Sequence, residues 1–267
     1  DDQLGLEETP EQYIDNMVEV FREVKRVLRK DGTVWLNLGD CYASTGGPIK
    51  KGGEWKDIMG QSKAMENSSK YDSKSRTIER YGGLKAKDLV GIPWRVALAL
   101  QADGWYLRSD IIWNKPNPMP EAVKDRPTKS HEYIFLLTKS AKYYYDYEAI
   151  KEKGEYPAGT RAAKASDERS SMSFVNSRPP EYKIYDGTRN KRSVWKITTK
   201  PYKVAHFATF PEELPETCIK AGTQKGDVVL DIFAGSGTTL RVASKLGRKG
   251  IGIELNPEYI KILKKRC

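Results

Sequence analysis

The feature that most constrains the fold is an apolar run, residues 228–239, that ends in a carboxylate and a glycine-rich turn. Its sequence is Val-Val-Leu-Asp-Ile-Phe-Ala-Gly-Ser-Gly-Thr-Thr, and a helix-forming segment follows from Leu240 to Leu246. This order is typical of a strand, a tight loop and a helix whose N-terminus holds a polar ligand. Gly235 and Gly237 carry no Cβ, so the backbone there can turn sharply and approach that ligand. The sequence therefore predicts an α/β domain with a cofactor loop.

A second apolar run, residues 250–253, ends in Glu254. A carboxylate at this distance behind the glycines is typical of one that binds ribose hydroxyls. No Gly-Lys-Ser/Thr follows the glycines, so the lysine that grips a triphosphate is absent. Thr239-Leu240 replaces the third glycine of the dinucleotide fingerprint. A cofactor with a ribose, a charged amino-acid end and no phosphate fits better, and this indicates S-adenosylmethionine.

The phrase Asp-x-Phe-Ala-Gly-Ser-Gly-Thr-Thr, followed by Gly-Ile-Glu-Leu-Asn-Pro-Glu-Tyr at 252–259, is more specific than a glycine pair. It resembles motif I and the acidic motif of the β-type DNA amino-methyltransferases, which modify cytosine N4 or adenine N6. Segments 35–40, 91–95 and 113–117 also have counterparts in that family, and so does the segment that begins at His206. The resemblance spans nearly the whole chain, with the catalytic half first and the cofactor half last.

The resemblance implies a Rossmann-like methyltransferase fold, with a mostly parallel seven-stranded sheet and a β-hairpin edge. S-adenosylmethionine would be the cofactor. We expect it to be bound by Asp231, Phe233, Ala234, Gly235, Ser236, Gly237, Thr238, Thr239 and Glu254, with Asp40 and Thr209 as further candidates.

The catalytic signature of that family, Asp/Ser/Asn-Pro-Pro-aromatic, should precede the first helix, and nothing before Thr9 matches it. Pro179-Pro180 has Arg178 before it and Glu181 after it, so we assign no catalytic residue within the chain. In the family this signature accepts hydrogen bonds from the target amine and stacks on the flipped base. The chain supplies candidates for five strands. We expect the strand with the signature and one further strand upstream of residue 1, which we do not take as the natural start.

The chain opens with a predicted helix from Thr9-Pro10 to Lys30, followed by a strand at 33–38 that runs into Asp40. Residues 44–87 are interpreted as a basic insertion. A second helix is predicted over 86–102, and strands over 105–113 and 132–138 are predicted to form a long hairpin. We assign residues 1–150 to the catalytic half, 151–200 to a basic segment that contacts DNA and recognises the target, and 201–267 to the cofactor half.

The net charge of +10 is concentrated in two segments. Residues 50–87 hold 10 Lys/Arg against 5 Asp/Glu, and residues 151–200 hold 12 against 6. Such segments are either solvated loops or surfaces that grip phosphates, and the cofactor loop favours the second interpretation. The candidate contacts to double-stranded DNA are Lys115, Arg126, Arg189, Lys191 and Arg192.

The three cysteines, Cys41, Cys218 and Cys267, form no Cys-x-x-Cys motif, and the chain has only two histidines. This pattern predicts no metal site and a reducing, cytoplasmic location. No apolar run reaches the roughly 20 residues of a membrane helix.

These observations predict a site-specific DNA methyltransferase of the restriction-modification type. It would methylate an exocyclic amine of a flipped base, with cytosine N4 slightly preferred over adenine N6, and a cognate restriction endonuclease is a candidate partner. Two alternatives remain at this stage: a DNA-binding module that keeps the fold without catalysis, and a methyltransferase that acts on RNA or protein. The sequence does not predict the recognition site or the oligomeric state.

Overall fold

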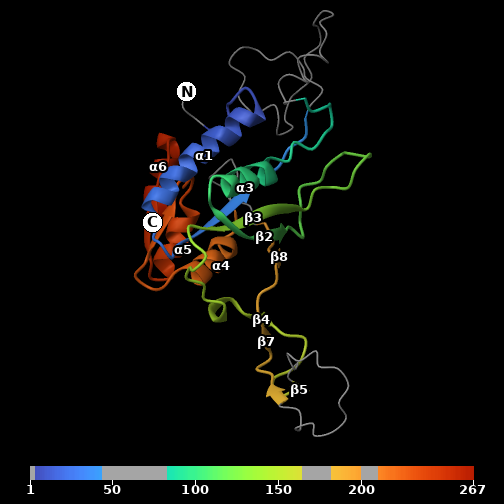
Figure 1. Cartoon of the computed structure of the whole chain (residues 1–267), viewed down its shortest axis with the longest axis vertical. Helices are drawn as coiled ribbons and strands as arrows, with labels where there is room; N and C mark the ends of the chain where they lie inside the picture. The colour runs from blue at the N-terminus through green and yellow to red at the C-terminus, as the bar shows by residue number, and fades with distance from the viewer. Residues whose placement is uncertain (1–3, 44–82, 164–181, 200–209) are drawn as a thin grey trace, which may run out of the picture. The chain divides into compact units, whose positions relative to one another are not determined.

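A computed structural model of the chain describes residues 4–43, 83–163, 182–199 and 210–267 (Figure 1). It divides into two compact units. The main unit comprises Asp1–Tyr145 and Ser193–Cys267, and the small unit comprises Asp146–Arg192. Several expectations fall outside the described residues, namely Thr209, the first residues (206–209) of the segment that begins at His206, Pro179-Pro180 and most of the insertion at 44–87.

Helix α1 (Pro10–Val27) begins where the sequence predicts. The Thr9 hydroxyl accepts a hydrogen bond from the Gln12 backbone N–H at 3.2 Å, and Pro10 occupies the first turn. The helix ends at Val27 rather than at Lys30. Met17 and Phe21 on its inner face are buried against the main sheet.

The main sheet has the strand order β1-β3-β2-β8. Strand β3 (His131–Thr138) pairs antiparallel with β1 (Thr33–Leu38) on one side and with β2 (Tyr106–Asn114) on the other. The predicted hairpin of residues 105–138 is therefore confirmed. Strand β8 (Val194–Lys196), which the sequence did not predict, adds in parallel to the free edge of β2.

Helices pack on both faces of the main sheet. Successive residues of a strand point to opposite faces, so neighbouring residues of β3 contact different helices. Phe135 and Leu137 of β3 pack with helices α1 and α3 (Ile92–Ala102). Ile134 lies on the opposite face, where α4 (Glu213–Gly222) contributes Leu214 and Cys218. The second half of β3, residues 134–138, is thus buried on both faces of the sheet.

Helix α3 begins at Ile92, six residues later than the sequence predicted. Gly91 has a φ of 77°, in the left-handed region, and Pro93 stands in the first turn. Lys87 also has a positive φ, of 73°. A helix cannot continue through such residues, so the stretch 86–91 is not helical. Its first two residues form a turn, and Leu89 pairs with Tyr42 in an isolated antiparallel bridge.

The cofactor half forms a second, parallel sheet of two strands, β9 (Val228–Asp231) and β10 (Lys249–Gly252). Helix α5 (Thr238–Lys245) lies directly on the glycines of β10. A Cβ added to Gly252 would lie 2.9 Å from Ala234 Cβ and from Leu240 Cδ2. The opposite face carries exposed apolar side chains, with 37–55% of each accessible to solvent: Val228, Leu230, Ile251 and Ile253. The final helix is α6 (Pro257–Arg266), with Asn256 as its cap.

The α/β class is confirmed, but the described strands do not form the expected seven-stranded sheet. They form the mixed main sheet and the separate β9–β10 pair. Among the described strands, β1 pairs only with β3 and β9 pairs only with β10. Each of the two sheets therefore ends in an edge whose backbone groups have no strand partner in the described ranges.

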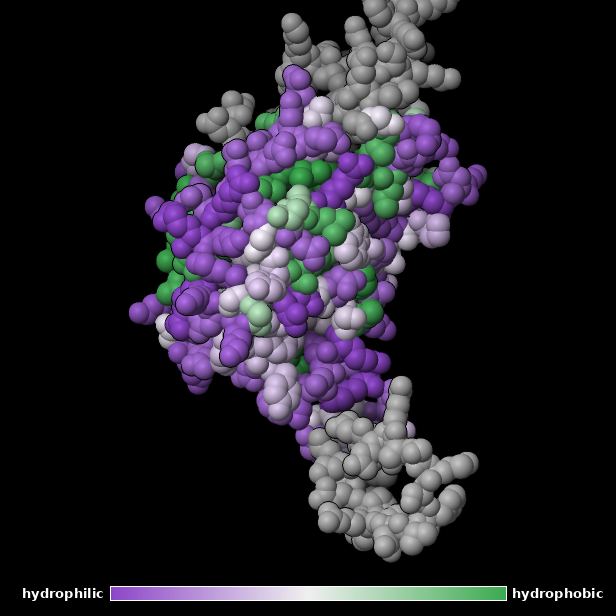
Figure 2. All heavy atoms as spheres, viewed as in Figure 1, coloured by the Kyte–Doolittle hydropathy of each residue, from purple (hydrophilic) through white to green (hydrophobic). Residues whose placement is uncertain are grey.

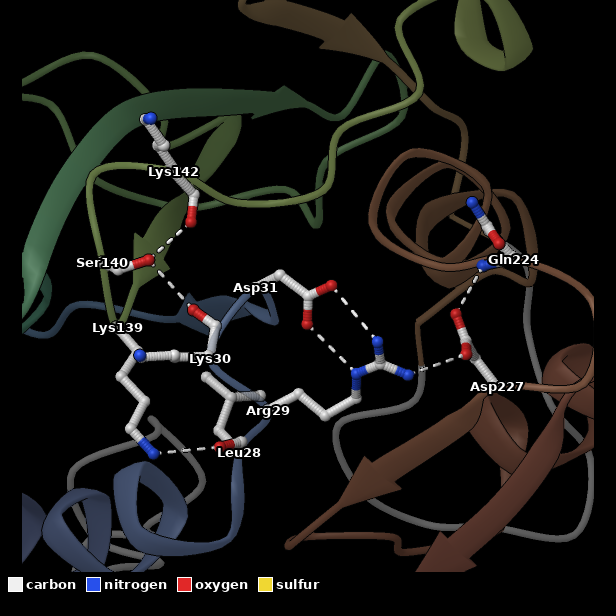
Figure 3. Close-up of polar contacts among 9 residues, drawn as sticks. All are labelled: Leu28, Arg29, Lys30, Asp31, Lys139, Ser140, Lys142, Gln224 and Asp227. Atoms are coloured by element: carbon white, nitrogen blue, oxygen red, sulfur yellow. Dashed lines mark hydrogen bonds and ion pairs between the residues drawn. The ribbon is translucent and has the colours of Figure 1, made fainter.

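The segment between α1 and β1 connects the main sheet to the β9–β10 sheet (Figure 3). Arg29 forms hydrogen bonds of 3.0 and 3.2 Å to Asp31 and an ion pair of 3.5 Å with Asp227, which precedes β9. The Ser140 hydroxyl donates to the Lys30 carbonyl at 2.9 Å. Because Arg29 is 73% exposed, this ion pair contributes little to stability. It shows that β1 and β9 begin at the same end of the unit.

The small unit contains short elements. Strand β4 (Glu152–Lys153) pairs with β7 (Thr188–Arg189), and β5 (Arg161–Ala163) pairs with β6 (Tyr182–Ile184), both antiparallel. A single 3-10 turn spans Glu148–Ile150.

None of the helices in the described ranges is long and apolar enough to cross a membrane. The surface in Figure 2 is mostly hydrophilic, and its hydrophobic residues gather in small patches.

The glycine face of β10 generates a stability prediction. We expect Gly252→Ala to lower the free energy of unfolding by about 1–3 kcal/mol, because the new methyl group overpacks against Ala234 and Leu240. Gly39→Ala is the matched control, since a Cβ there meets no atom within 4 Å. Urea denaturation of both variants tests this, and equal midpoints would show that α5 moves away without cost.

Candidate functional site

The glycine-rich loop between β9 and α5 has the conformation that its sequence requires. Gly235 and Gly237 have φ values of 50° and 79°, in the left-handed region where a Cβ is strained. The Asp231 carboxylate accepts a hydrogen bond from the Phe233 N–H at 3.0 Å and fixes the start of the loop. The Gly237 N–H donates to the Ala234 carbonyl at 2.8 Å and closes the turn.

Glu254 joins this loop from the neighbouring strand. One oxygen of its carboxylate accepts from the Gly235 N–H at 2.8 Å, and the other accepts from the Asn256 N–H at 2.8 Å. Each carboxylate oxygen keeps a second lone pair that a ribose hydroxyl could use. The structure therefore brings together Asp231, the glycines and Glu254 at the carboxyl ends of two adjacent parallel strands, where α/β folds bind ligands.

The loop side chains divide into two groups. Phe233 is 52% exposed, and Leu255, next to Glu254, is 73% exposed. In contrast, Ser236 and Thr238 are buried, and their hydroxyls lie within hydrogen-bond distance of Arg266. Apolar side chains beside two carboxylates and a loop with two glycines fit an adenosyl group, which needs flat apolar contact and acceptors for its ribose.

Asp40 lies at the end of β1 and caps helix α3. Its Oδ1 accepts hydrogen bonds from the backbone N–H groups of Cys41, Gly91 and Ile92, at 2.9, 2.9 and 3.1 Å. A carboxylate at a helix N-terminus also interacts favourably with the helix dipole. Asp40 therefore has a structural role at the start of α3, and its contact with the cofactor stays a prediction.

Beside Asp40 lies a polar cluster that the sequence did not predict. Lys115 forms an ion pair with Glu132 and lies 4.4 Å above the Trp113 ring. Glu132 also accepts from the Asn37 side chain at 3.1 Å. The three polar residues come from the ends of β1, β2 and β3, so only strand pairing places them together. Residue alternation along each predicted strand gave no signal for such a contact.

Lys129 lies in the loop before β3. Burial lowers its pKa, and the neighbouring carboxylates of Asp40 and Glu132 act in the opposite direction.

Four of the five cations predicted to contact DNA have a carboxylate partner in the structure. In the main unit, Arg126 pairs with Glu121 at 2.5 Å and lies 3.9 Å above the Tyr42 ring. Lys115 pairs with Glu132. These partners come from the same hairpin, 5 and 17 residues away along the chain.

In the small unit, Arg189 pairs with Glu152 at 2.9 Å and with Glu155 at 2.7 Å. Arg192 pairs with the same Glu152 at 2.6 Å. The Arg189 guanidinium lowers the pKa of Glu155 through this hydrogen bond. An arginine has five N–H donors, so one that binds a carboxylate keeps donors for a phosphate. Lys191 lies beside this cluster in the sequence and also has an interaction partner.

Among the described residues, no group of three or more His, Cys, Asp or Glu could hold a metal ion.

The chain as a whole matches one protein family. Residues 1–265 match the N6_N4_Mtase family, described as DNA methylase. The chain belongs to this DNA methylase family. The predicted resemblance is confirmed, and so is the predicted enzyme class of amino-methyltransferases that use S-adenosylmethionine.

The methylase has close relatives among type II methyltransferases. It is 48% identical to M.Cfr9I of Citrobacter freundii over 262 aligned residues. The alignment covers 98% of this chain and 73% of that protein. The methylase is 46% identical over 264 residues to M.SmaI of Serratia marcescens, which covers 99% and 77%.

Two solved structures share the fold. The cytosine-N4-specific PvuII DNA methyltransferase matches with a TM-score of 0.61 at 20% identity, over 96% of this chain and 71% of that chain. A DNA modification methylase of Thermus thermophilus, TTHA0409, solved with S-adenosyl-L-methionine, matches with a TM-score of 0.55 at 23% identity, over 96% and 76%.

The Glu254 contacts generate a prediction about cofactor affinity. We expect Glu254→Ala to weaken S-adenosylmethionine binding by roughly 1.5–3 kcal/mol, the range for hydrogen bonds to a charged group. Glu258→Ala is the matched control, because Glu258 is exposed on α6. Titration calorimetry measures both, and wild-type affinity in the Glu254 variant would remove this residue from the site.

Proposed function

We propose that this methylase transfers the methyl group of S-adenosylmethionine to an exocyclic amine of a base flipped out of double-stranded DNA. The observation that carries this proposal is the joining of the glycine loop to Glu254 at 2.8 Å, in a chain matched by a DNA methylase family over residues 1–265. The relatives are named type II methyltransferases, which supports a role in restriction-modification with a cognate endonuclease. We expect a cytoplasmic location, where bacterial DNA lies.

The chain contributes position rather than a nucleophile. The cofactor supplies an electrophilic methyl group on a sulfonium. Glu254 would accept hydrogen bonds from the ribose, and Phe233 and Leu255 offer apolar surface to the adenine. The loop glycines let the backbone approach the methionine end. Alignment of this kind supplies much of the rate in group transfer between bound partners.

For the target we propose cytosine N4 in preference to adenine N6. This follows the cytosine-N4 specificity of the PvuII enzyme, which has a similar fold. Analysis of methylated nucleosides by mass spectrometry separates N4-methylcytosine from N6-methyladenine.

We further propose that a strand with the family's Pro-Pro-aromatic signature pairs between β1 and β9, and that another pairs beside β10. The first strand would pair with the edges of β1 and β9, which have no strand partner there in the described ranges. The ion pair between Arg29 and Asp227 indicates that β1 and β9 begin at the same end of the main unit. A parallel strand there would satisfy backbone groups that otherwise cost about 1–3 kcal/mol each when buried. Its carboxyl end would emerge between Asp40 and the glycine loop, where amine and methyl group must meet.

This arrangement predicts that residues 1–267 alone bind S-adenosylmethionine but do not transfer its methyl group to DNA. A chain extended upstream by a segment with the signature should be active, because correct alignment is worth roughly 7–11 kcal/mol of barrier. The measurement is transfer of labelled methyl groups to duplex DNA, with cofactor binding checked in both chains. Clear activity of residues 1–267 would mean that other groups hold the amine, and Asp40 would be the first to test.

The alternatives give different results in the same assay. A DNA-binding module without catalysis would bind duplex DNA and stay inactive after the extension. A methyltransferase for RNA or protein would label those substrates in preference to DNA. The family match favours DNA over both.

The small unit carries the prediction on DNA binding. We expect Lys191→Ala/Arg192→Ala to lower DNA affinity and to flatten its salt dependence by about one unit per lost phosphate contact. Lys264→Ala/Lys265→Ala on α6 removes the same charge and is the control. Binding is measured over a series of salt concentrations. An unchanged slope in the first variant would show that these two cations face solvent in the complex.

A further inference from the structure

Arg266, the last residue of α6, reaches back to the glycine loop. One of its guanidinium nitrogens lies 3.0 Å from the Ser236 carbonyl, 2.7 Å from the Ser236 hydroxyl and 3.3 Å from the Thr238 hydroxyl. These acceptors are 28–30 residues away in the sequence. A single side chain thus holds both residues that flank Gly237.

The last turn of α6 also packs on the loop backbone. A Cβ added to Gly237 would lie 2.9 Å from Leu263 Cγ and 3.2 Å from Cys267 Sγ. The Cys267 thiol itself lies 3.5 Å from the Gly237 carbonyl. The left-handed turn at Gly237 and the position of α6 therefore depend on each other.

This contact changes the expected role of two loop side chains. Ser236 and Thr238 are 7% and 6% exposed, so their hydroxyls are screened from solvent. A hydroxyl has one proton to donate and two lone pairs, and here lone pairs face a guanidinium. The sequence assigned both residues to the cofactor, whereas their hydroxyl contacts in the structure are to Arg266.

The charge of Arg266 is matched from another element. Helix α5 begins at Thr238 without a side-chain cap, and a cation at a helix N-terminus opposes the helix dipole. Glu212, just before α4, supplies the nearby negative charge. Lys245 lowers the pKa of Glu212 most, through a hydrogen bond, and Arg241 and Arg266 lower it further. Glu212 therefore joins the start of α4 to α5 through ion pairs with Arg241 and Lys245, and its negative charge lies near Arg266.

We propose that Arg266 is a positioning residue for cofactor binding: it fixes the glycine loop through Ser236 and Thr238, whose hydroxyls bind the arginine rather than the cofactor. This inference rests on the proposed role of the loop in holding S-adenosylmethionine. The arginine acts through the backbone that it orients, so its loss should raise the Kd for the cofactor.

The test is a mutant cycle read by calorimetry with S-adenosylmethionine on the full chain. Arg266→Ala should weaken binding at least about tenfold, the effect of lost hydrogen bonds to a charged group. Arg266→Lys keeps the charge with fewer contacts and should be intermediate. Lys265→Ala, on the exposed neighbour, should stay within about twofold. Thermal unfolding of each variant shows which are folded.

The decisive comparison adds Ser236→Ala/Thr238→Val to wild type and to Arg266→Ala. If the hydroxyls act through the arginine, they weaken binding in the wild type and cause no further loss in Arg266→Ala. Losses that add would overturn the proposal, because the hydroxyls would then contact the cofactor directly. If Arg266→Ala does not fold, the same cycle with Arg266→Lys decides. A wild-type chain that binds no cofactor would remove the proposed role of the loop itself, whereas wild-type affinity in Arg266→Ala would remove only this inference.

Discussion

The cofactor half depends on the close approach of helix α5 to a strand that has glycines where it would otherwise carry side chains. Gly250 and Gly252 bring the backbone of β10 against Leu240, and a Cβ at Gly250 would lie 3.1 Å from Leu240 Cα. Because the helix is so near the sheet, the chain between β9 and α5 must reverse within a few residues. That reversal requires the left-handed glycines of the loop. It also places the Gly235 N–H where the Glu254 carboxylate can bind it.

Electrostatic matching is local in both units. The arginines of the small unit face glutamates of the same hairpin, and the lysine at the end of β2 faces a glutamate of β3. A DNA phosphate that binds such a cation must either displace the carboxylate that is already paired with it or share the cation with that carboxylate. Among the described residues, the candidate DNA contacts Lys115, Arg126, Arg189 and Arg192 therefore already have a carboxylate partner before DNA binds.

Local patterns predicted the parts of the fold that local physics decides. The Thr9-Pro10 cap, strand β1 and the loop after β9 follow from a few consecutive residues. Strand β8 has only three residues in a polar segment, so it shows no periodicity, and its existence depends on pairing with β2. Helix α6 did carry a signal, Asn256-Pro257, which is an ordinary helix start.

The site shows the same division. Proximity of Asp231, the glycines and Glu254 followed from the order of the motifs, because adjacent parallel strands end at one edge. The contact of Arg266 with Ser236 and Thr238 joins residues 28–30 positions apart on elements that no pattern relates. The ion pairs of Lys115 and Arg189 are likewise tertiary and could not be predicted from charge alone. The seven-stranded sheet came from the family resemblance, and the described strands do not form it.

The edge of β9 that pairs with no other described strand has a consequence for the behaviour of this chain in solution. Beside that edge, one face of the β9–β10 pair exposes Val228, Leu230, Ile251 and Ile253. An unpaired edge next to an apolar face is a template for strands of other molecules, and natural proteins usually shield such edges. Copies of the chain in this state would associate through their edges as concentration rises, so self-association would compete with folding of the complete sheet.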